Sequence, residues 1–206
     1  MPDAVLKTAY TARYGVLERL SKGLSAHIED CMTGQPRIDK ISARAKSIDR
    51  FLRKADKLDD DGRTKYDDPL GQIQDQIGAR IVVFYKSDVD RIHDRVVKYF
   101  TPIEAQKLVP EKESEFGYFG QHYVLVLPRD LIEADMDAGQ IPAFFELQVK
   151  TLFQHAWSEA DHDLGYKPTD EPLTPEQKRL IAFTAAQAWG ADHIFDRLYL
   201  ERNPPA

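Results

Sequence analysis

The stretch FELQVKTLFQHAWSEADHDLGYK, residues 145–167, runs from an apolar strand directly into a helix. Because side chains alternate along a strand, Glu146 and Gln148 fall on the same face of it. The helix that follows carries three further side chains close to that strand: Trp157, Glu159 and His162. A carboxylate on a strand, next to a polar helix face, is a common setting for phosphate-transfer chemistry.

A second acid lies at the start of another strand, in the stretch DQIGARIVVFY at 75–85. Residues 77–85 form a continuous apolar run with β-branched members, which predicts a buried strand. Asp75 precedes this run, Gly78 lets a ligand approach the backbone, and Arg80 needs an anionic partner or a planar ring. Two acids on neighbouring strands can hold a divalent metal against the phosphates of a nucleotide. The alternatives are a strand-start cap for Asp75 and an ion pair across the sheet for Arg80.

The remaining elements follow from hydrophobic period and from capping residues. The predicted order is helix 3–31, helix 38–58, loop 59–71, strand 77–85, helix 88–100 capped by Ser87, strand 122–127, polar excursion 128–142, strand 143–149, helix 152–164, and a helix from Pro175 to about 200 with Thr174 as its cap. Strands and helices alternate, with a hairpin-like pair of strands late in the chain. This pattern predicts an α+β (mixed α/β) fold with helices at both ends.

Composition narrows the class of protein. The chain has 206 residues, of which 42% are hydrophobic, enough for one domain with a substantial core. The single cysteine, Cys31, excludes an internal disulfide and fits a reducing, cytoplasmic setting. No apolar run is long enough for a signal peptide or a membrane helix, so we expect no membrane partner. The net charge of -6 argues against a broad nucleic-acid surface.

Basic residues nevertheless concentrate in RIDKISARAKSIDRFLRKADK, residues 37–57. In the helix predicted there, Lys46, Arg50 and Lys54 are spaced four residues apart and share one face. Arg44 joins that face only if the helix begins between Arg44 and Lys46. Cations gathered in this way can bracket a triphosphate. The alternative is a solvated basic face.

The stretch GYFGQHY, residues 117–123, places an aromatic ring on a glycine-containing loop that enters a strand. Tyr118 in such a loop can stack on a nucleotide base. The alternative is a turn whose tyrosine packs on the core. A separate candidate, zinc held by His155, Glu159 and His162 on one helix face, is weaker than a structural role because no cysteine or HExxH order supports it.

Taken in order, these motifs resemble the synthetase domain of the RelA/SpoT family, the alarmone synthetases. That family shows R-x-K…K, then D-x-x-G-x-R, G-Y-x-x-x-H, E-x-Q-x-[RK]-T, and W-x-E-x-x-H followed by Y-K. The matching residues here are Arg44, Lys46, Lys54, Asp75, Gly78, Arg80, Gly117, Tyr118, His122, Glu146, Gln148, Lys150, Thr151, Trp157, Glu159, His162, Tyr166 and Lys167. The resemblance implies a synthetase domain at 37–168, between an N-terminal helical segment at 1–36 and a C-terminal helix at 169–206.

The resemblance also implies a nucleotidyltransferase-like mixed sheet flanked by helices, and a reaction. The β,γ-pyrophosphate of ATP would move to the 3′-hydroxyl of GDP or GTP, which makes (p)ppGpp and releases AMP. On the donor side, Arg44 and Arg80 would stack on the adenine, while Lys46 and Lys54 would hold the phosphates of ATP.

The implied catalytic residues are Asp75 and Glu146, which would bind Mg²⁺, with Glu146 also accepting the proton of the 3′-hydroxyl. On the acceptor side, Tyr118 would stack on the base, with His122 and Gln148 nearby. Lys107 matches a family lysine at the acceptor phosphates.

Departures from the family pattern lie near the donor helix and the acceptor loop. Arg50 and Gly120 stand where members usually have serine, and Phe116 stands where they often have asparagine. Three functions therefore stay open: a (p)ppGpp synthetase, a toxin-type member that makes (p)ppApp or pyrophosphorylates the 3′ end of tRNA, and a weakly catalytic nucleotide-binding regulatory module. The expected partners are ATP and GDP or GTP, with a homo-oligomer or an antitoxin as a protein partner; the net charge weighs against tRNA.

Overall fold

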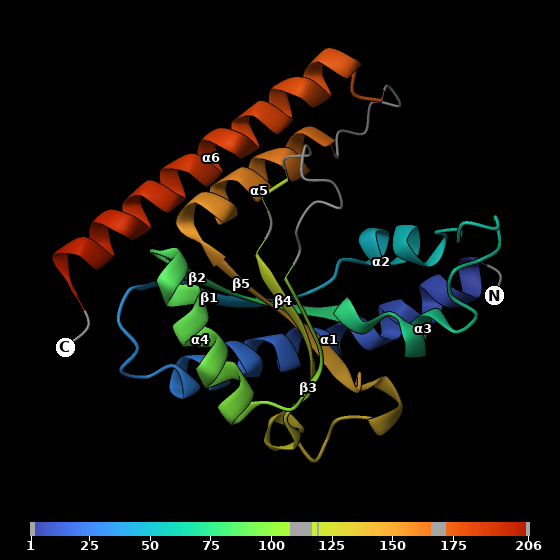
Figure 1. The fold of residues 1–206 in the computed structure, drawn as a ribbon. Helices are drawn as coiled ribbons and strands as arrows, with labels where there is room; N and C mark the ends of the chain where they lie inside the picture. Colours follow the sequence, from blue (N-terminus) through green and yellow to red (C-terminus); the bar gives the residue numbers. More distant parts are fainter. Residues whose placement is uncertain (1–2, 108–116, 119, 166–171, 205–206) are drawn as a thin grey trace.

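A five-stranded mixed sheet forms the centre of the protein (Figure 1). The computed structural model describes residues 3–107, 117–118, 120–165 and 172–204. The strands are β1 (Ile38–Ala45), β2 (Ile77–Val83), β3 (Pro102–Lys107), β4 (Gln121–Val126) and β5 (Phe144–Thr151), in the order β1-β2-β5-β4-β3. Strands β2 and β5 are parallel and the other neighbouring pairs are antiparallel. This arrangement confirms the predicted mixed α+β fold and the late antiparallel pair, β4 and β5.

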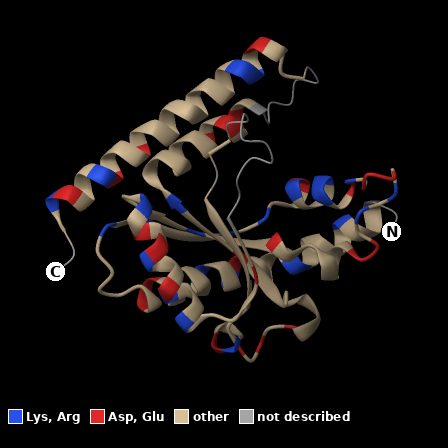
Figure 2. Cartoon of the chain, viewed as in Figure 1, with Lys and Arg blue, Asp and Glu red and all other residues tan. Residues whose placement is uncertain are grey.

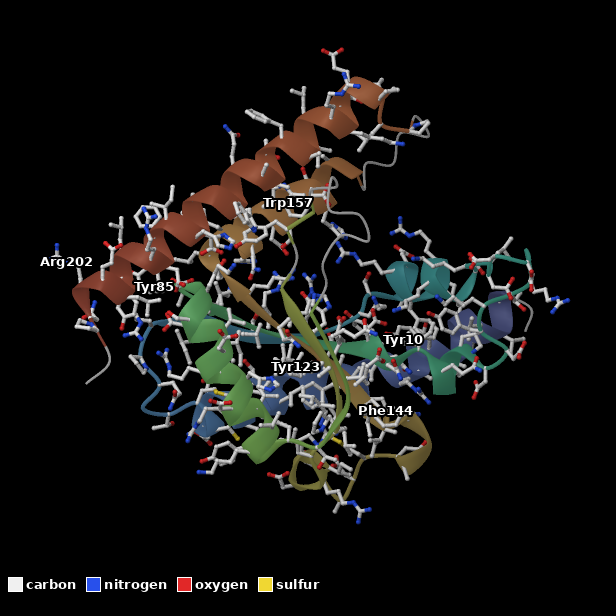
Figure 3. All side chains as sticks on the ribbon, viewed as in Figure 1. Tyr10, Tyr85, Tyr123, Phe144, Trp157 and Arg202 are labelled. Atoms are coloured by element: carbon white, nitrogen blue, oxygen red, sulfur yellow. The ribbon has the colours of Figure 1, made fainter. Side chains whose placement is uncertain are left out.

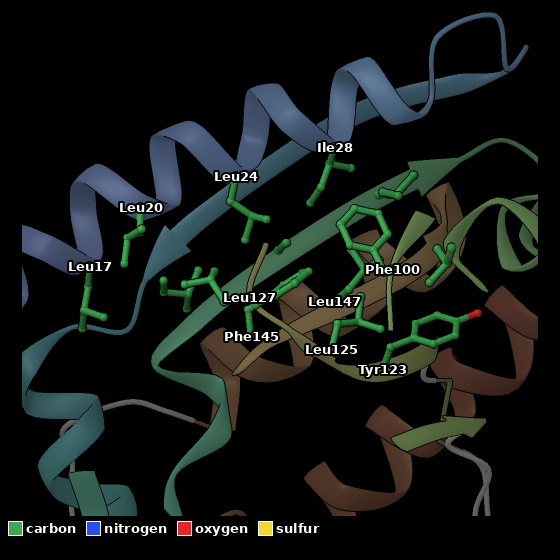
Figure 4. Packing of buried hydrophobic residues seen from close by; sticks show 14 of the residues in the cluster. Leu17, Leu20, Leu24, Ile28, Phe100, Tyr123, Leu125, Leu127, Phe145 and Leu147 are labelled. Carbon is green, nitrogen blue, oxygen red and sulfur yellow. The ribbon is translucent and has the colours of Figure 1, made fainter. Parts of the chain in front are cut away.

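One face of the sheet is covered by α1 (Asp3–Cys31) and α4 (Lys86–Tyr99), and the main core lies there (Figure 4). The apolar side chains of α1 recur every three or four residues and point onto the strands. The fully buried ones include Leu17, Leu20, Leu24 and Ile28. Each such side chain contributes about 1.5–3 kcal/mol through burial. The helix predicted over 3–31 is confirmed.

Helices α5 (Leu152–Gly165) and α6 (Pro175–Arg202) lie toward the opposite face, whereas α2 (Ile48–Ala55) packs against α1 through Phe51. Helix α6 runs alongside α5 (Figure 1). Its start is the predicted one: the Thr174 side chain accepts a hydrogen bond from the Gln177 backbone, and the Gln177 side chain accepts one from the Thr174 backbone. Short helical turns α3 (Pro69–Gln72), η1 (Gln74–Gln76), η2 (Arg129–Leu131) and η3 (Ala138–Gln140) lie in the connections.

The single helix predicted over 38–58 is wrong. Its first half is strand β1, and only Ile48–Ala55 is helical. The apolar residues of β1 happen to continue the three-to-four-residue spacing of α2, which hid the boundary at Ser47. Strand β3 was not predicted, because its short, polar, exposed sequence carries no apolar pattern. Helix α4 begins at Lys86 with Tyr85 as its cap, not at Ser87, because the Asp88 carboxylate accepts a hydrogen bond from the Tyr85 backbone.

Within the described residues, no helix combines the length and the apolarity that crossing a membrane requires.

Candidate active site

The register of the sheet lines up polar side chains on the face opposite the main core. Arg80 on β2 lies beside Gln148 on β5, which lies beside His122 on β4. Two residues earlier on both strands, Gly78 lies beside Glu146. Since alternate residues of a strand share a face, these two rows form one polar floor. The sequence prediction that Glu146 and Gln148 share a strand face agrees with this register.

Glu146 is held by its two neighbours on that floor. The Nδ1 atom of His122 lies 3.1 Å from Glu146 Oε1, and the Gln148 amide donates a hydrogen bond of 3.0 Å to Oε2. Burial alone would raise the pKa of the Glu146 carboxyl. The hydrogen bond and charge of His122, the Gln148 amide and the charge of Lys54 outweigh burial and hold this pKa below its ordinary value. Glu146 is therefore a carboxylate at neutral pH.

Asp75 lies in η1, directly before β2, and pairs with two lysines. Lys46 Nζ and Lys54 Nζ lie 2.8 and 3.0 Å from the same oxygen, Asp75 Oδ2. The other carboxylate oxygen, Oδ1, is buried and has no hydrogen-bond partner among the described residues. Lys46 and Lys54, which were predicted to share a basic helix face, are thus brought together on Asp75, although Lys46 lies between β1 and α2 rather than on a helix.

Packing between α1 and α2 fixes the position of these lysines. The Tyr10 ring of α1 stacks on Phe51 of α2, with centroids 3.7 Å apart and planes 4° from parallel (Figure 3 labels Tyr10). The Tyr10 hydroxyl donates a 2.7 Å hydrogen bond to the Lys46 carbonyl, and the Lys46 backbone N–H donates to Gln76. Basic residues also gather on α2 itself (Figure 2). These contacts therefore fix the backbone from which Lys46 and Lys54 reach Asp75.

Arg80 lies in mid-strand on β2 and reaches α5. Its Nη1 atom donates to Glu159 Oε1 at 2.6 Å and to His155 Nδ1 at 3.0 Å. Burial and the Arg80 charge lower the pKa of His155, so its ring accepts this hydrogen bond in the neutral form. Burial works to raise the pKa of Glu159, but its hydrogen bond to Arg80 lowers it overall. Arg80 thus has the ion pair that its strand position called for.

Glu146, Gln148, Asp75, Lys46, Arg80, His155 and Glu159 all border one cavity of about 840 Å³. His122 and Lys54 do not line it, but they contact Glu146 and Asp75, which do. The wall of the cavity is built from β1, β2, β5, the start of α2 and one face of α5. The lining residues that carry charge or a titratable or amide group are Lys40, Arg44, Lys46, Arg50, Asp75, Arg80, Glu146, Gln148, Lys150, His155, Glu159, Asp161 and His162. A cavity of this size and polarity suits a nucleotide rather than an apolar ligand.

Lys150 is a residue whose importance sequence reasoning missed, since it entered only as a motif match. It is 4% exposed, lies on the cavity face two residues beyond Gln148, and donates a 3.0 Å hydrogen bond to Ser158 Oγ of α5. Burial first, and then the charge of Arg80, lowers the pKa of its amine to about 8. The alternation Glu146, Gln148, Lys150 was the signal that placed it in the site.

Tyr118 does not offer its ring to the cavity. The ring is 6% exposed and packs with Trp157 of α5 and Ala185 of α6, and its hydroxyl donates a hydrogen bond to Asp192 (Figure 3 labels Trp157). The expectation of a ring available to an acceptor base is therefore not met in this structure, because apolar side chains of α5 and α6 surround Tyr118. The alternative considered for the sequence, a tyrosine packed in a core, describes the observed position.

The side chain of Lys107 and all of Tyr166 and Lys167 lie outside the described residues. No group of three or more His, Cys, Asp or Glu side chains suited to a metal occurs in the described part of the chain, and two of the three residues considered for zinc, His155 and Glu159, instead contact Arg80.

The residues proposed for Mg²⁺ fit that ion by chemistry. Asp75 and Glu146 offer carboxylate oxygens, the ligand type that Mg²⁺ prefers, and Mg²⁺ commonly uses only one or two protein carboxylates together with substrate phosphates. The buried and unpartnered Asp75 Oδ1 supplies an oxygen that the protein itself leaves unused. A magnesium site between η1 and β5 is consistent with this arrangement.

The chain is similar in sequence and in fold to known proteins. Residues 43–171 match the family model described as a region found in RelA / SpoT proteins. The chain is 26% identical over 156 residues to GTP pyrophosphokinase YjbM of Bacillus subtilis (strain 168), a match that covers 73% of this chain and 66% of that protein. The fold resembles the crystal structure of the small alarmone synthetase 1 from Bacillus subtilis, with a TM-score of 0.73, 18% identity, and coverage of 95% of this chain and 97% of that one.

The same synthetase bound to its product pppGpp gives a TM-score of 0.68 at 21% identity, over 93% of this chain and 94% of that one. At these identities the structural likeness shows the fold. The family model spans more than half of the chain and includes the cavity residues from Arg44 to His162. The chain belongs to the RelA/SpoT family.

Proposed function

We propose that this protein transfers the β,γ-pyrophosphate of ATP to the 3′-hydroxyl of GDP or GTP, with Mg²⁺ as cofactor. The observation that carries the proposal is the convergence of two differently arranged carboxylates on one cavity. Glu146 is ionised and oriented by a histidine and an amide, while Asp75 is paired with two lysines. The first arrangement suits a base, and the second suits a site for phosphate and metal.

Glu146 is the proposed general base. The acceptor 3′-oxygen attacks the β-phosphorus of ATP, and the proton of the 3′-hydroxyl passes to the Glu146 carboxylate. The bond between the β-phosphorus and the oxygen that bridges the α- and β-phosphates breaks, and AMP leaves with that oxygen. The lowered pKa keeps Glu146 ready to accept the proton at neutral pH. His122 and Gln148 hold both of its oxygens, which fixes the direction from which the acceptor approaches.

Lys46 and Lys54 are the proposed contacts of the donor phosphates. In the free protein both ammonium groups neutralise Asp75. When bound, Mg²⁺ supplies charge neutralisation to the phosphoryl oxygens during transfer. Phosphate oxygens are alternative acceptors for the two lysines, so nucleotide binding frees Asp75 Oδ2 while the ammonium groups remain paired.

Arg44 and Arg80 are the proposed contacts of the adenine. They lie on neighbouring strands of the cavity floor, and Gly78 between them carries no side chain. A planar guanidinium stacks favourably on an aromatic base. A Cβ built at Gly78 meets no atom within 4 Å, which leaves the floor open between these arginines. The hydrogen bonds to Glu159 and His155 orient the Arg80 side chain already in the free protein.

A guanine acceptor is favoured over an adenine acceptor or tRNA. The curated relative is named a GTP pyrophosphokinase, and a structural relative has been determined with pppGpp bound. The net charge of -6 is unfavourable for tRNA, whose affinity depends on many phosphate contacts. The toxin-type reactions, on adenosine nucleotides or on the tRNA 3′ end, are the second candidate because Arg50 and Gly120 depart from the family pattern.

The test is transfer of label from γ-labelled ATP to a panel of GDP, GTP, GMP, ADP, AMP and bulk tRNA. Label in a guanine nucleotide, with one AMP released per transfer, is the expected result. Label in an adenosine nucleotide or in tRNA would replace the guanine assignment with the toxin-type one. No transfer to any acceptor would leave a nucleotide-binding regulatory module as the better description.

A further inference from the structure

Helix α6 presents an exposed apolar face on the side that points away from α5 (Figure 1). Its inner side packs on α5 and the sheet, where Ala185 and Asp192 are buried. At 3.6 residues per turn, the large apolar side chains on the opposite side are Leu180, Phe183, Ile194 and Leu198. These four side chains are between 44% and 60% exposed. The solvent side of a surface helix is ordinarily its polar side, so this face is unusual.

The middle of the helix carries no charge on any side. From Leu180 to Ala191 the chain has no acidic or basic residue, and the charged residues gather toward the two ends of α6 (Figure 2). Gly190 lies on the outward side, and a Cβ built there meets no atom within 4 Å. The backbone of the helix is therefore open to close approach from outside. An exposed apolar patch with polar ends marks an interaction surface.

The charges that border this face complement each other in reverse order. Glu176 and Arg179 lie at the start of α6, and Glu201 and Arg202 lie at its end. Two copies of α6 laid antiparallel about a two-fold axis near residue 189 bring Glu176 to Arg202 and Arg179 to Glu201 of the second copy. A parallel pair would instead set each of these charges against its own copy, which is unfavourable. The pattern of charge therefore favours the antiparallel pair.

The apolar side chains obey the same symmetry. About an axis near residue 189, Leu180 meets Leu198 of the second copy, and Phe183 meets Ile194 of the second copy. Gly190 then lies close to the axis, where the two backbones approach most closely. A two-fold interface uses the same patch on both copies, so each of these contacts occurs twice. One register thus satisfies both the apolar side chains and the charged ends.

We propose that the outward face of α6 binds a second copy of this chain, with the two helices antiparallel about a two-fold axis near residue 189. A helix of 28 residues is about 42 Å long, so the uncharged middle and both charged ends make contact together. A different protein or a lipid surface would place no demand on the two ends to complement each other. This pairing goes beyond the proposed function and does not depend on it.

Sedimentation of the protein over a range of micromolar concentrations tests the pairing. The expected mass of the wild type is that of two chains. Phe183→Asp places two like charges in the apolar contact and should halve the mass at the same concentrations, and Ile194→Asp should do the same. Both side chains are more than half exposed, so circular dichroism should show an unchanged fold. The matched control is Val97→Asp, which changes an exposed apolar residue of α4 and should leave the mass unchanged.

A charge reversal tests the register. Arg179→Glu turns two attractive pairs into repulsive ones and should raise the dissociation constant of the pair by roughly 5- to 30-fold. Adding Glu201→Arg to the same chain should restore the wild-type constant within about 3-fold, because the opposite charges then meet again. Lys178→Glu reverses a charge at the same end of α6 but off the apolar face, and should change the constant by less than about 2-fold. A double variant that binds no better than Arg179→Glu would contradict the register.

Disulfide formation tests the direction of the helices. Cys31→Ser removes the single native cysteine. In that background Gln187→Cys lies next to the axis and should cross-link two chains under mild oxidation. Leu180→Cys should not, because the two copies of residue 180 lie about 27 Å apart along antiparallel helices. Cross-linking at both positions would mean a parallel pair.

The outcomes separate this pairing from other uses of the face. A wild type with the mass of one chain at every concentration would overturn the pairing and assign the face to another protein or to a lipid surface. A wild-type pair that Phe183→Asp and Ile194→Asp both leave intact would place the contact elsewhere and also overturn it. If Phe183→Asp fails to fold, Ile194→Asp decides alone. None of these measurements involves pyrophosphate transfer, so the pairing and the proposed function can fail separately.

Discussion

Gly78 lines the cavity and Gly120 packs against β5, so adding one methyl group at each position separates an effect on ligand binding from an effect on stability. A Cβ built at Gly120 lies 2.3 Å from the Val149 carbonyl oxygen and 2.6 Å from Lys150 Cγ. The backbone oxygen belongs to β5 and cannot move without disturbing the sheet. Overpacking of this kind costs about 1–3 kcal/mol, so Gly120→Ala should lower the free energy of unfolding by that amount.

A Cβ at Gly78 meets nothing within 4 Å, so Gly78→Ala should leave the free energy of unfolding within about 0.5 kcal/mol of wild type. The new methyl group instead projects into the cavity floor between β1 and β5, where the donor is proposed to lie. One misplaced methyl in a binding pocket is worth roughly 1–3 kcal/mol, about a 10- to 200-fold rise in the KM for ATP. Denaturant unfolding and initial rates against ATP concentration measure the two effects. A stable Gly78→Ala enzyme with an unchanged KM for ATP would refute the placement of the donor over β2.

Two further predictions test the charges of the site. Asp75→Asn should raise the Mg²⁺ concentration needed for half-maximal activity, because one of two proposed carboxylate ligands is lost, and Mn²⁺ should restore part of the activity; wild-type activity that is indifferent to EDTA would exclude the metal. The pKa of the Lys150 amine is lowered to about 8 in the folded state, against 10.5 in the unfolded chain. Between these values the unfolded chain binds more protons, so the free energy of unfolding rises with pH, by roughly 1–2 kcal/mol from pH 8 to 9.5. Denaturant unfolding at several pH values should show this rise in the wild type and not in Lys150→Met; an equal dependence of the free energy of unfolding on pH in both proteins would mean that Lys150 stays protonated in this range.

The shared strand face of Glu146 and Gln148 could be predicted from the sequence because strand alternation alone decides it. Glu146 and Gln148 two residues apart must share a face, and the apolar run after Asp75 must be buried beside them. The register that sets Arg80 beside Gln148 is a tertiary contact that the sequence did not predict. The structure brings Asp75, Glu146 and Arg80 to the border of one cavity.

Strand β1 was mispredicted although its sequence held the correct signal. Lys40, Ser42 and Arg44 face the cavity, while Ile41 and Ala43 pack on the core, which is a period of two. The helical period of the residues after Ser47 dominated the longer window. Two small alanines gave the strand face too little hydrophobic contrast to compete.

The seat of Tyr118 could not be predicted, because it depends on α6. Nothing in GYFGQHY indicates that a carboxylate more than 70 residues later lies buried beneath it. Asp192 lies within α6, and an acid in a helix would ordinarily be assigned to the solvent face. Long-range polar contacts of this kind carry no local period, so only the three-dimensional structure reveals them.

The role of Glu146 is the central claim, and Glu146→Gln tests it most directly. The amide is nearly the same shape as the carboxylate and keeps an oxygen for His122, but it cannot accept a proton. With γ-labelled ATP and GDP, we expect label transfer to fall by about 10²- to 10⁴-fold, with ATP binding measured by calorimetry changed little. Transfer at a near wild-type rate by the folded Glu146→Gln protein would exclude Glu146 as the general base.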